Sequence, residues 1–165
     1  MANQTYNLKE IIEMAIQIET SGAAFYKRVK EIARNEEAEE LFGYLEAAEY
    51  QHMKDFQDVL DSALEKHGNV EYSVSEQELL YLRAFASRRI FQDPEDAVAK
   101  AEALSDAVEA IDMALDFELR SVSFYQDLAR IIEDPEDRAS VEDLERQERG
   151  HAARLYQIRE KMTTD

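Results

Sequence analysis

The sequence repeats itself with a shift of 99 residues, and this repeat constrains the fold more than any other feature. The best-matched positions hold acidic residues and histidines, which are Glu19, Glu49 and His52 in the first half and Glu118, Glu148 and His151 in the second. The aromatic pair Phe25-Tyr26 falls on Phe124-Tyr125 under the same shift, and no gap is needed. The chain is therefore predicted to contain two copies of one structural unit.

Each copy has the pattern of a helical hairpin, because its apolar residues recur at steps of three or four. We expect one hairpin over about 7–67, a second over about 106–163, and a connection over about 68–105. Helix starts and stops are marked by the usual capping residues. These are Asn7, Asn35, Ser75, Asp93-Pro94, Asp106 and Asp134-Pro135 at the starts, and Gly68 at a stop.

The connection is far longer than the loops that join neighbouring helices in a bundle. Two hairpins in this order predict an all-α, ferritin-like four-helix bundle with one long helical crossover, forming a single domain over residues 1–165. A helix near 75–92 in the crossover is expected either to pack on the bundle or to form a dimer contact. We favour a homodimer.

The spacing of the glutamates predicts where they lie along the bundle. In each hairpin the two glutamates are 30 residues apart, from 19 to 49 and from 118 to 148, with the turn near the midpoint. At a rise of about 1.5 Å per residue, the chain travels about 23 Å to the turn and about 21 Å back. All four glutamates are therefore predicted to meet in one layer.

Such a layer is expected to hold metal. In Glu49-x-x-His52 and Glu148-x-x-His151 the spacing of three places both side chains on one helix face. Four buried carboxylates carry four negative charges, which two divalent ions would cancel and which would otherwise be costly to bury. The predicted ligands of a di-metal centre are Glu19, Glu49, His52, Glu118, Glu148 and His151. Carboxylates with imidazoles suit two iron ions, and manganese or zinc are alternatives.

Histidine is rare here, which strengthens this interpretation. A single histidine on an apolar helix face is usually part of the core, but two of the three histidines occupy repeat-equivalent positions beside a glutamate. The third, His67, lies near a helix end and is given no role. Glu46 and Glu145, one turn before a predicted ligand, are expected to be solvated or to cap. Alternatively, they support the ligands or occasionally bind the metal themselves.

Four further residues are expected near the centre. Gly22 and Ser121, each three residues after a predicted ligand, are small and would leave room for a ligand such as dioxygen or peroxide. Tyr26 and Tyr125 face the core two turns after the same glutamates. They are expected either to pack there with a satisfied hydroxyl or to hydrogen-bond a ligand carboxylate.

Composition excludes several classes of function. The formal net charge of −18 opposes binding to nucleic acid or to anionic membrane surfaces. No apolar run approaches the roughly 20 residues of a membrane span. The absence of cysteine rules out disulfides, iron–sulfur clusters and thiolate metal sites. The first six residues lack the basic and apolar regions of a signal peptide, so a cytoplasmic location is expected.

Taken together, these residues resemble the rubrerythrin branch of the ferritin-like superfamily. The resemblance rests on Glu19 with Tyr26, Glu49-x-x-His52, Glu118 with Tyr125, and Glu148-x-x-His151. It implies a non-haem di-iron peroxidase that reduces hydrogen peroxide, in defence against oxidative stress, with electrons from a rubredoxin-type centre.

Two departures from the family pattern modify this expectation. The rubredoxin module needs four cysteines and this chain has none, so an electron donor must be a separate protein. Typical rubrerythrins also carry a glutamate one turn after the first ligand of the third helix, where this chain has Ser121. The more symmetric site is closer to ferroxidase or oxygenase centres. Three hypotheses follow: a peroxide- or dioxygen-reducing enzyme, a ferroxidase or iron-handling protein, and a structural bundle with an empty or non-redox site.

Overall fold

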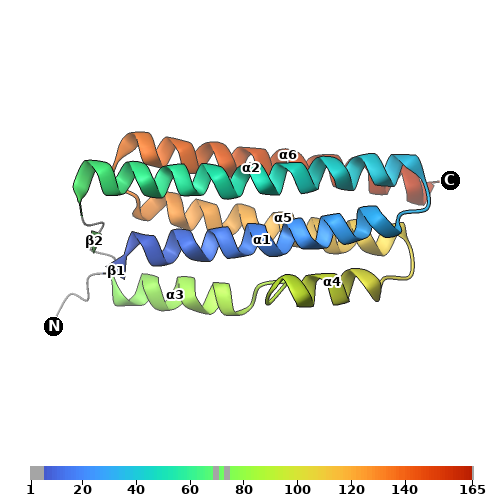
Figure 1. Ribbon diagram of the computed structural model, residues 1–165, viewed down its shortest axis with the longest axis horizontal. Coiled ribbons are helices and arrows are strands. Elements are labelled where there is room, and N and C mark those ends of the chain that lie inside the picture. The colour runs from blue at the N-terminus through green and yellow to red at the C-terminus, as the bar shows by residue number, and fades with distance from the viewer. Residues whose placement is uncertain (1–5, 69–70, 73–74, 165) are drawn as a thin grey trace.

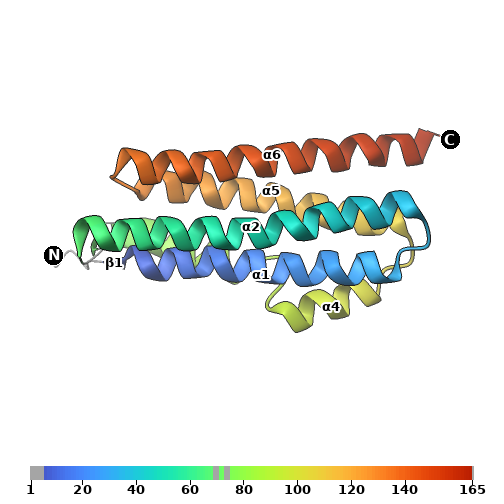
Figure 2. The same ribbon diagram turned by 45° about the horizontal axis from the view of Figure 1, so that its top comes forward.

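Four long helices form an antiparallel bundle in the computed structural model, which describes residues 6–68, 71–72 and 75–164 (Figures 1 and 2). They are α1 (Leu8–Ile32), α2 (Glu36–His67), α5 (Ala107–Ile131) and α6 (Pro135–Thr164). The first two helices form one hairpin and the last two form the other. The predicted all-α bundle of two helical hairpins is confirmed.

The capping residues explain where the long helices begin and end. The side chains of Asn35, Asp106 and Asp134 each accept a hydrogen bond from the backbone N–H three residues later, as N-caps do. Gly68 ends α2 with a φ of 65°, a conformation that glycine adopts without a steric penalty, and its N–H donates to the Leu64 carbonyl. The cap predicted at Asn7 lies outside the described side chains.

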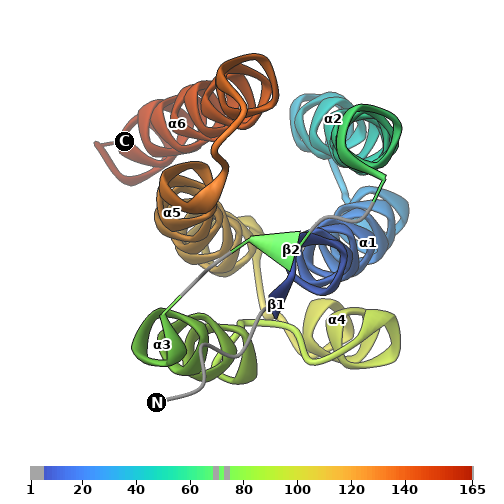
Figure 3. The ribbon, with the colours of Figure 1, turned by 90° about the vertical axis from the view of Figure 1, so that its left-hand side faces the viewer.

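The crossover contains two helices, α3 (Glu76–Ser87) and α4 (Pro94–Glu102). Ser75 and Glu78 form the predicted capping box, and Asp93 caps α4 ahead of its proline. The helix expected over 75–92 ends earlier, at Ser87, because the chain must turn before the second cap. In the end view, α3 lies beside α5 and α4 beside α1, so the crossover covers the α1–α5 side of the bundle (Figure 3). Its predicted role in a dimer stays a prediction.

Two short strands, β1 (Tyr6–Asn7) and β2 (Glu71–Tyr72), pair in an antiparallel manner with Tyr6 opposite Tyr72. Helical periodicity gave no sign of this pairing. It arises because the chain enters α1 and leaves α2 at the same end of the bundle (Figure 1).

Aromatic side chains fill much of the core. Tyr26 packs against the rings of Phe42 and Phe117, and Phe56 lies 4.8 Å from Tyr125 between ring centroids. The outer faces of the same helices are strongly charged. Accordingly, no helix among the described residues is both long and apolar enough to cross a membrane.

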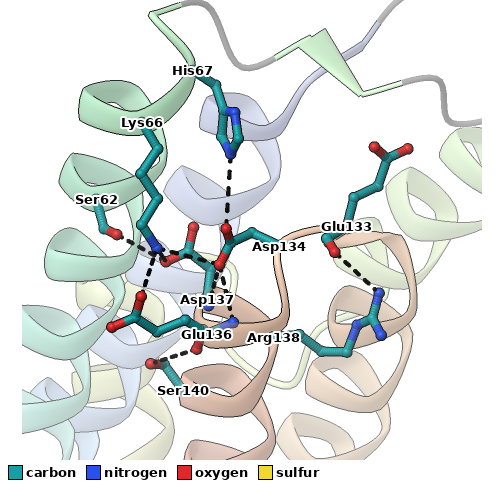
Figure 4. A network of polar contacts seen from close by, with 9 residues as sticks. All are labelled: Ser62, Lys66, His67, Glu133, Asp134, Glu136, Asp137, Arg138 and Ser140. Atoms are coloured by element: carbon teal, nitrogen blue, oxygen red, sulfur yellow. Dashed lines mark hydrogen bonds and ion pairs between the residues drawn. The ribbon is translucent and has the colours of Figure 1, made fainter.

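A polar network joins the end of α2 to the start of α6 (Figure 4). At its centre, Asp137 is 2% exposed and accepts hydrogen bonds from the Ser62 hydroxyl at 2.9 Å and the Lys66 ammonium at 3.4 Å. Lys66 also pairs with Asp134, the residue that caps α6. The network therefore links the two hairpins at the end of the bundle where the chain turns from α5 into α6.

Replacing Asp137 with alanine should lower the free energy of unfolding by about 1–3 kcal/mol, because Ser62 and Lys66 lose a buried acceptor. Urea unfolding of the metal-free protein measures this loss. Asp58→Ala is the matched control, since it removes an exposed carboxylate from α2 and should change stability by less than about 0.5 kcal/mol. Equal losses in the two variants would contradict the structural role of the network.

Candidate metal centre

The structure brings all six predicted ligands together in one layer of the bundle. One side chain comes from α1, two come from α2, one comes from α5 and two come from α6: Glu19; Glu49 and His52; Glu118; Glu148 and His151. Five of these residues have a relative exposure of 0%, and His151 is 5% exposed. The equal heights follow from the matched spacing in the two hairpins, because each helix turn lies midway between its two glutamates.

The six side chains form two overlapping groups of four. Within each group, ligand atoms from all four residues lie within 4.8 Å of one another, as they do around a metal ion. The groups are Glu19, Glu49, His52 and Glu148 in one case, and Glu49, Glu118, Glu148 and His151 in the other. Glu49 and Glu148 belong to both groups, so each of these carboxylates would serve both sites if both groups bound metal.

The buried oxygen atoms of this cluster fit a metal centre. Both carboxylate oxygens of Glu19 and both of Glu49 lack a hydrogen-bond partner among the described residues. One oxygen each of Glu118 and Glu148 also lacks one. Unpartnered buried carboxylate oxygens are rare in folded proteins because their desolvation costs several kcal/mol. Cations at the centre of the cluster would supply the missing partners.

His52 is oriented with Nδ1 toward the centre. Its Nδ1 lies 2.8 Å from Oε1 of Glu148 and 3.4 Å from Oε2 of Glu19, and it makes no hydrogen bond within the described chain. Its Nε2 lies 3.1 Å from Oε1 of Gln147, which can accept the ring N–H. This contact leaves Nδ1 as the lone-pair donor for a metal, the arrangement that metal-binding histidines usually show.

Gln147 is a functional candidate that sequence reasoning missed. Its repeat-equivalent residue is Ala48, so the shift by 99 gives no hint of its role. A glutamine directly before a ligand on α6 reaches across to a histidine of α2, a pairing that only the packing of the two helices reveals.

His151 has different neighbours from His52. Its Nδ1 lies 3.0 Å from Oε2 of Glu148 and 3.5 Å from Oε2 of Glu118. Its ring meets that of Tyr44 edge to face at 5.7 Å, and the guanidinium of Arg154 lies 4.6 Å above Tyr44. An aromatic side chain that is about half exposed thus separates this histidine from solvent.

Electrostatics in the metal-free cluster favour the protonated forms of three glutamates and both histidines. Burial raises the pKa of the three glutamates other than Glu148, and repulsion between the carboxylates raises it further. Burial also raises the pKa of Glu148, but contacts with Glu118 and both histidines outweigh it and bring the pKa below its usual value. Burial lowers the pKa of both histidines, yet the adjacent carboxylates prevail and raise it to about 9 for His52 and about 10 for His151.

The two tyrosines are equivalent in sequence but not in contacts. The Tyr26 hydroxyl donates a hydrogen bond to Oε1 of Glu118 at 2.6 Å. Of the two predicted roles, Tyr26 therefore has the hydrogen bond to a predicted ligand carboxylate. The Tyr125 hydroxyl is buried and has no partner among the described residues. Glu118 therefore accepts a hydrogen bond from a buried tyrosine, whereas Glu19 has no such donor among the described residues.

The remaining acidic candidates and the third histidine have other neighbours. Glu46 pairs with Lys30, and Glu145 pairs with Arg149 while accepting a hydrogen bond from Gln126 at 3.1 Å. His67 lies at the end of α2, 3.9 Å from Asp134. None of the three belongs to either group of converging ligand atoms found in the described chain.

Gly22 and Ser121 both contact Phe117, another residue that sequence reasoning missed. The ring of Phe117 packs over Gly22, where a methyl group would come within 2.7 Å of ring carbon Cε1. The Ser121 hydroxyl donates to the Phe117 carbonyl at 3.1 Å, and Ser121 lines a small cavity. The space beside Gly22 is therefore filled by an aromatic ring, whereas the space beside Ser121 is partly open.

Replacing His52 or His151 with alanine should each remove about one bound ion per chain, because each histidine belongs to only one of the two ligand groups. Anaerobic loading with ferrous iron, followed by elemental analysis, measures the stoichiometry. His67→Ala is the control and should keep full loading, since its ring is about half exposed and lies at a helix end. Unchanged metal content in both test variants would contradict the proposed ligand set.

Metal binding should strengthen as the pH rises from 6 to 8. The raised pKa values mean that the metal-free cluster holds protons at neutral pH, whereas metal ligation needs ionised carboxylates and neutral imidazoles. Loading therefore releases protons, and acid opposes it. Calorimetric titration with Co²⁺ in buffers of different ionisation enthalpy measures the release. A binding heat that is independent of the buffer would contradict the expected proton release.

Comparisons with known proteins agree with this geometry. No curated protein matches the chain. A crystal structure from Thermotoga maritima, described as a ferritin-like diiron-carboxylate protein, superposes with a TM-score of 0.73 at 19% identity and covers 98% of this chain and 100% of that one. It shows a shared ferritin-like fold. The family model named Rubrerythrin matches residues 10–159, a span that includes all six clustered side chains. The chain therefore belongs to the rubrerythrin family.

Proposed function

We propose that this protein is a di-iron oxidoreductase that reduces hydrogen peroxide or dioxygen with electrons from a separate donor protein. The observation that carries the proposal is the pair of ligand groups that share Glu49 and Glu148. Two ions held by shared carboxylates lie close enough to act together. Mixed carboxylate and imidazole ligands favour iron or manganese, and the rubrerythrin family match together with the solved structural relative described as a diiron-carboxylate protein favours iron.

The protein residues would hold, orient and insulate the ions. Glu19 with His52 would complete one ion site, and Glu118 with His151 the other. Bound iron would supply two electrons, which with two protons convert one hydrogen peroxide molecule into two water molecules. Tyr26 holds its hydroxyl proton against Oε1 of Glu118 and so fixes the position of that carboxylate. Burial of the cluster keeps bulk water away from it.

The electrons must come from another molecule. The chain contains no cysteine, so it cannot hold the rubredoxin-type iron centre that the family resemblance implies as the electron source. A separate redox protein is the proposed donor.

A ferroxidase or iron-handling role is the alternative, and Ser121 favours it. A glutamate one turn after Glu118 would add an extra ligand to one side of the centre, but Ser121 instead bonds the Phe117 carbonyl. The resulting ligand set is the same for both ions. The net charge of −18 would also favour the approach of ferrous ions.

Steady-state assays with iron-loaded protein distinguish the two roles. The oxidoreductase should consume peroxide continuously with a reduced one-electron donor protein, while its iron content stays at two ions per chain. Glu49→Gln should abolish this turnover, because it removes a carboxylate shared by both ligand groups. Glu46→Gln is the matched control, since its charge partner is Lys30, and it should retain most of the activity.

Two outcomes would replace the proposal. Accumulation of many iron ions per chain without peroxide turnover would favour iron handling. Loading of fewer than one ion per chain under anaerobic conditions would favour the third hypothesis, a structural bundle without a redox centre.

A further inference from the structure

A small cavity is lined by residues of α1, α3, α5 and the link between α3 and α4. The crossover helices lie on the side of the bundle opposite α2 and α6 (Figure 3). The apolar side chains that line the cavity are Ile18, Phe117, Phe85, Ile90 and Phe91. The volume open to the centre of a water-sized molecule is about 10 Å³, close to the minimum that one water needs. The cavity therefore suits a molecule of two or three atoms and excludes a bulky one.

The Phe117 ring lies next to both this cavity and the metal cluster. It lines the cavity, and it also packs over Gly22, beside a cluster carboxylate. A methyl group at Gly22 would lie 2.7 Å from Cε1 of Phe117 and 3.0 Å from Oε2 of Glu49, so the ring and the shared carboxylate flank the same position.

Two arginines without carboxylate partners also line the cavity. The Nε atom of Arg89 is buried and has no hydrogen-bond partner, and Arg120 donates to the Arg88 carbonyl at 2.7 Å. Within the described ranges neither forms an ion pair. Both guanidinium groups are positively charged at neutral pH. They would attract small anions and donate hydrogen bonds to small polar molecules.

We infer that this cavity is the route by which a small oxidant reaches the metal centre, with Phe117 as the barrier that sets the size of the molecule admitted. Arg89 and Arg120 make the route favourable for polar and anionic molecules. The inference rests on the proposed redox function, because it assigns an entry path to the oxidant. Phe117 acts here as a specificity-determining residue.

Phe117→Leu tests the barrier, because leucine is shorter and leaves space beside Gly22. The ratio of reaction rates with tert-butyl hydroperoxide and hydrogen peroxide should rise by about tenfold, the order expected for a change of pocket size by a few carbon atoms. Phe124→Leu is the matched control, since Phe124 is buried on the same helix but does not line the cavity. An equal ratio in both variants would overturn the role of Phe117.

Azide binding to Co²⁺-loaded protein tests the route without turnover. Ser121→Leu places a larger side chain in the cavity and should slow azide binding by about tenfold, as followed by the visible absorption of Co²⁺. Phe117→Leu should accelerate it. If Ser121→Leu lowers the metal content, its azide-binding rate is not comparable with that of wild type. The rate measured for Phe117→Leu then tests the route by itself. Azide binding at the same rate in wild type and Phe117→Leu would overturn the route.

The arginines are tested by the dependence of azide binding on salt. Arg89→Gln should slow azide binding by about threefold at low ionic strength and should weaken its salt dependence. Arg146→Gln makes the same change in net charge on α6, where Arg146 pairs with Asp143, and should have little effect. Equal effects of the two substitutions would overturn the role of Arg89.

The two proposals can fail separately. If azide binding responds to these substitutions but peroxide is not turned over, the route stands and the redox function fails. If peroxide is turned over at rates that none of the cavity substitutions changes, the function stands and the route fails.

Discussion

Repulsion among four glutamates buried in one layer is the interaction on which the rest of the structure depends. Their charges cannot be left in an apolar core without counterions, so the metal-free cluster must hold protons, as the raised pKa values of Glu19, Glu49 and Glu118 indicate. Two divalent ions would remove the repulsion and satisfy the unpartnered oxygens at once. Metal binding and the stability of the bundle are therefore expected to be coupled through the same carboxylates.

The internal repeat produces a pseudo-symmetric ligand set, but its surroundings differ between the halves. Two pairs of equivalent residues show this difference: Ala48 with Gln147, and Tyr26 with Tyr125. Gln147 contacts His52 and the Tyr26 hydroxyl donates to Glu118, whereas the Tyr125 hydroxyl has no partner among the described residues. Gly22 and Ser121 also differ, since the Phe117 ring packs over Gly22 while the Ser121 hydroxyl bonds the Phe117 carbonyl. The two ligand groups therefore contain similar ligands, but the residues that contact these ligands differ between the two halves.

The crossover does more than join the hairpins. Because α3 packs beside α5 and α4 beside α1, the link between them lies over the α1–α5 side of the bundle, away from the histidines on α2 and α6. The ring of Phe91 stacks on Phe25 at 4.7 Å and lies 5.3 Å from that of Phe117. The crossover thus helps to hold the Phe117 ring in place and covers the small cavity next to it.

The sequence by itself determined the helical hairpins, their caps and the six clustering side chains. Helical periodicity, capping residues such as Asn35 and Asp134, and the equal spacing of the glutamates are local or repeat-based signals, so they can be read without tertiary contacts. Only the tertiary structure decided which residues surround the cluster. Gln147 reaches His52 across two helices, Phe117 fills the space beside Gly22, and the crossover closes the cavity. Such contacts depend on how helices that are distant in sequence pack side by side. The spacing of residues along the chain does not specify which side chains of those helices meet.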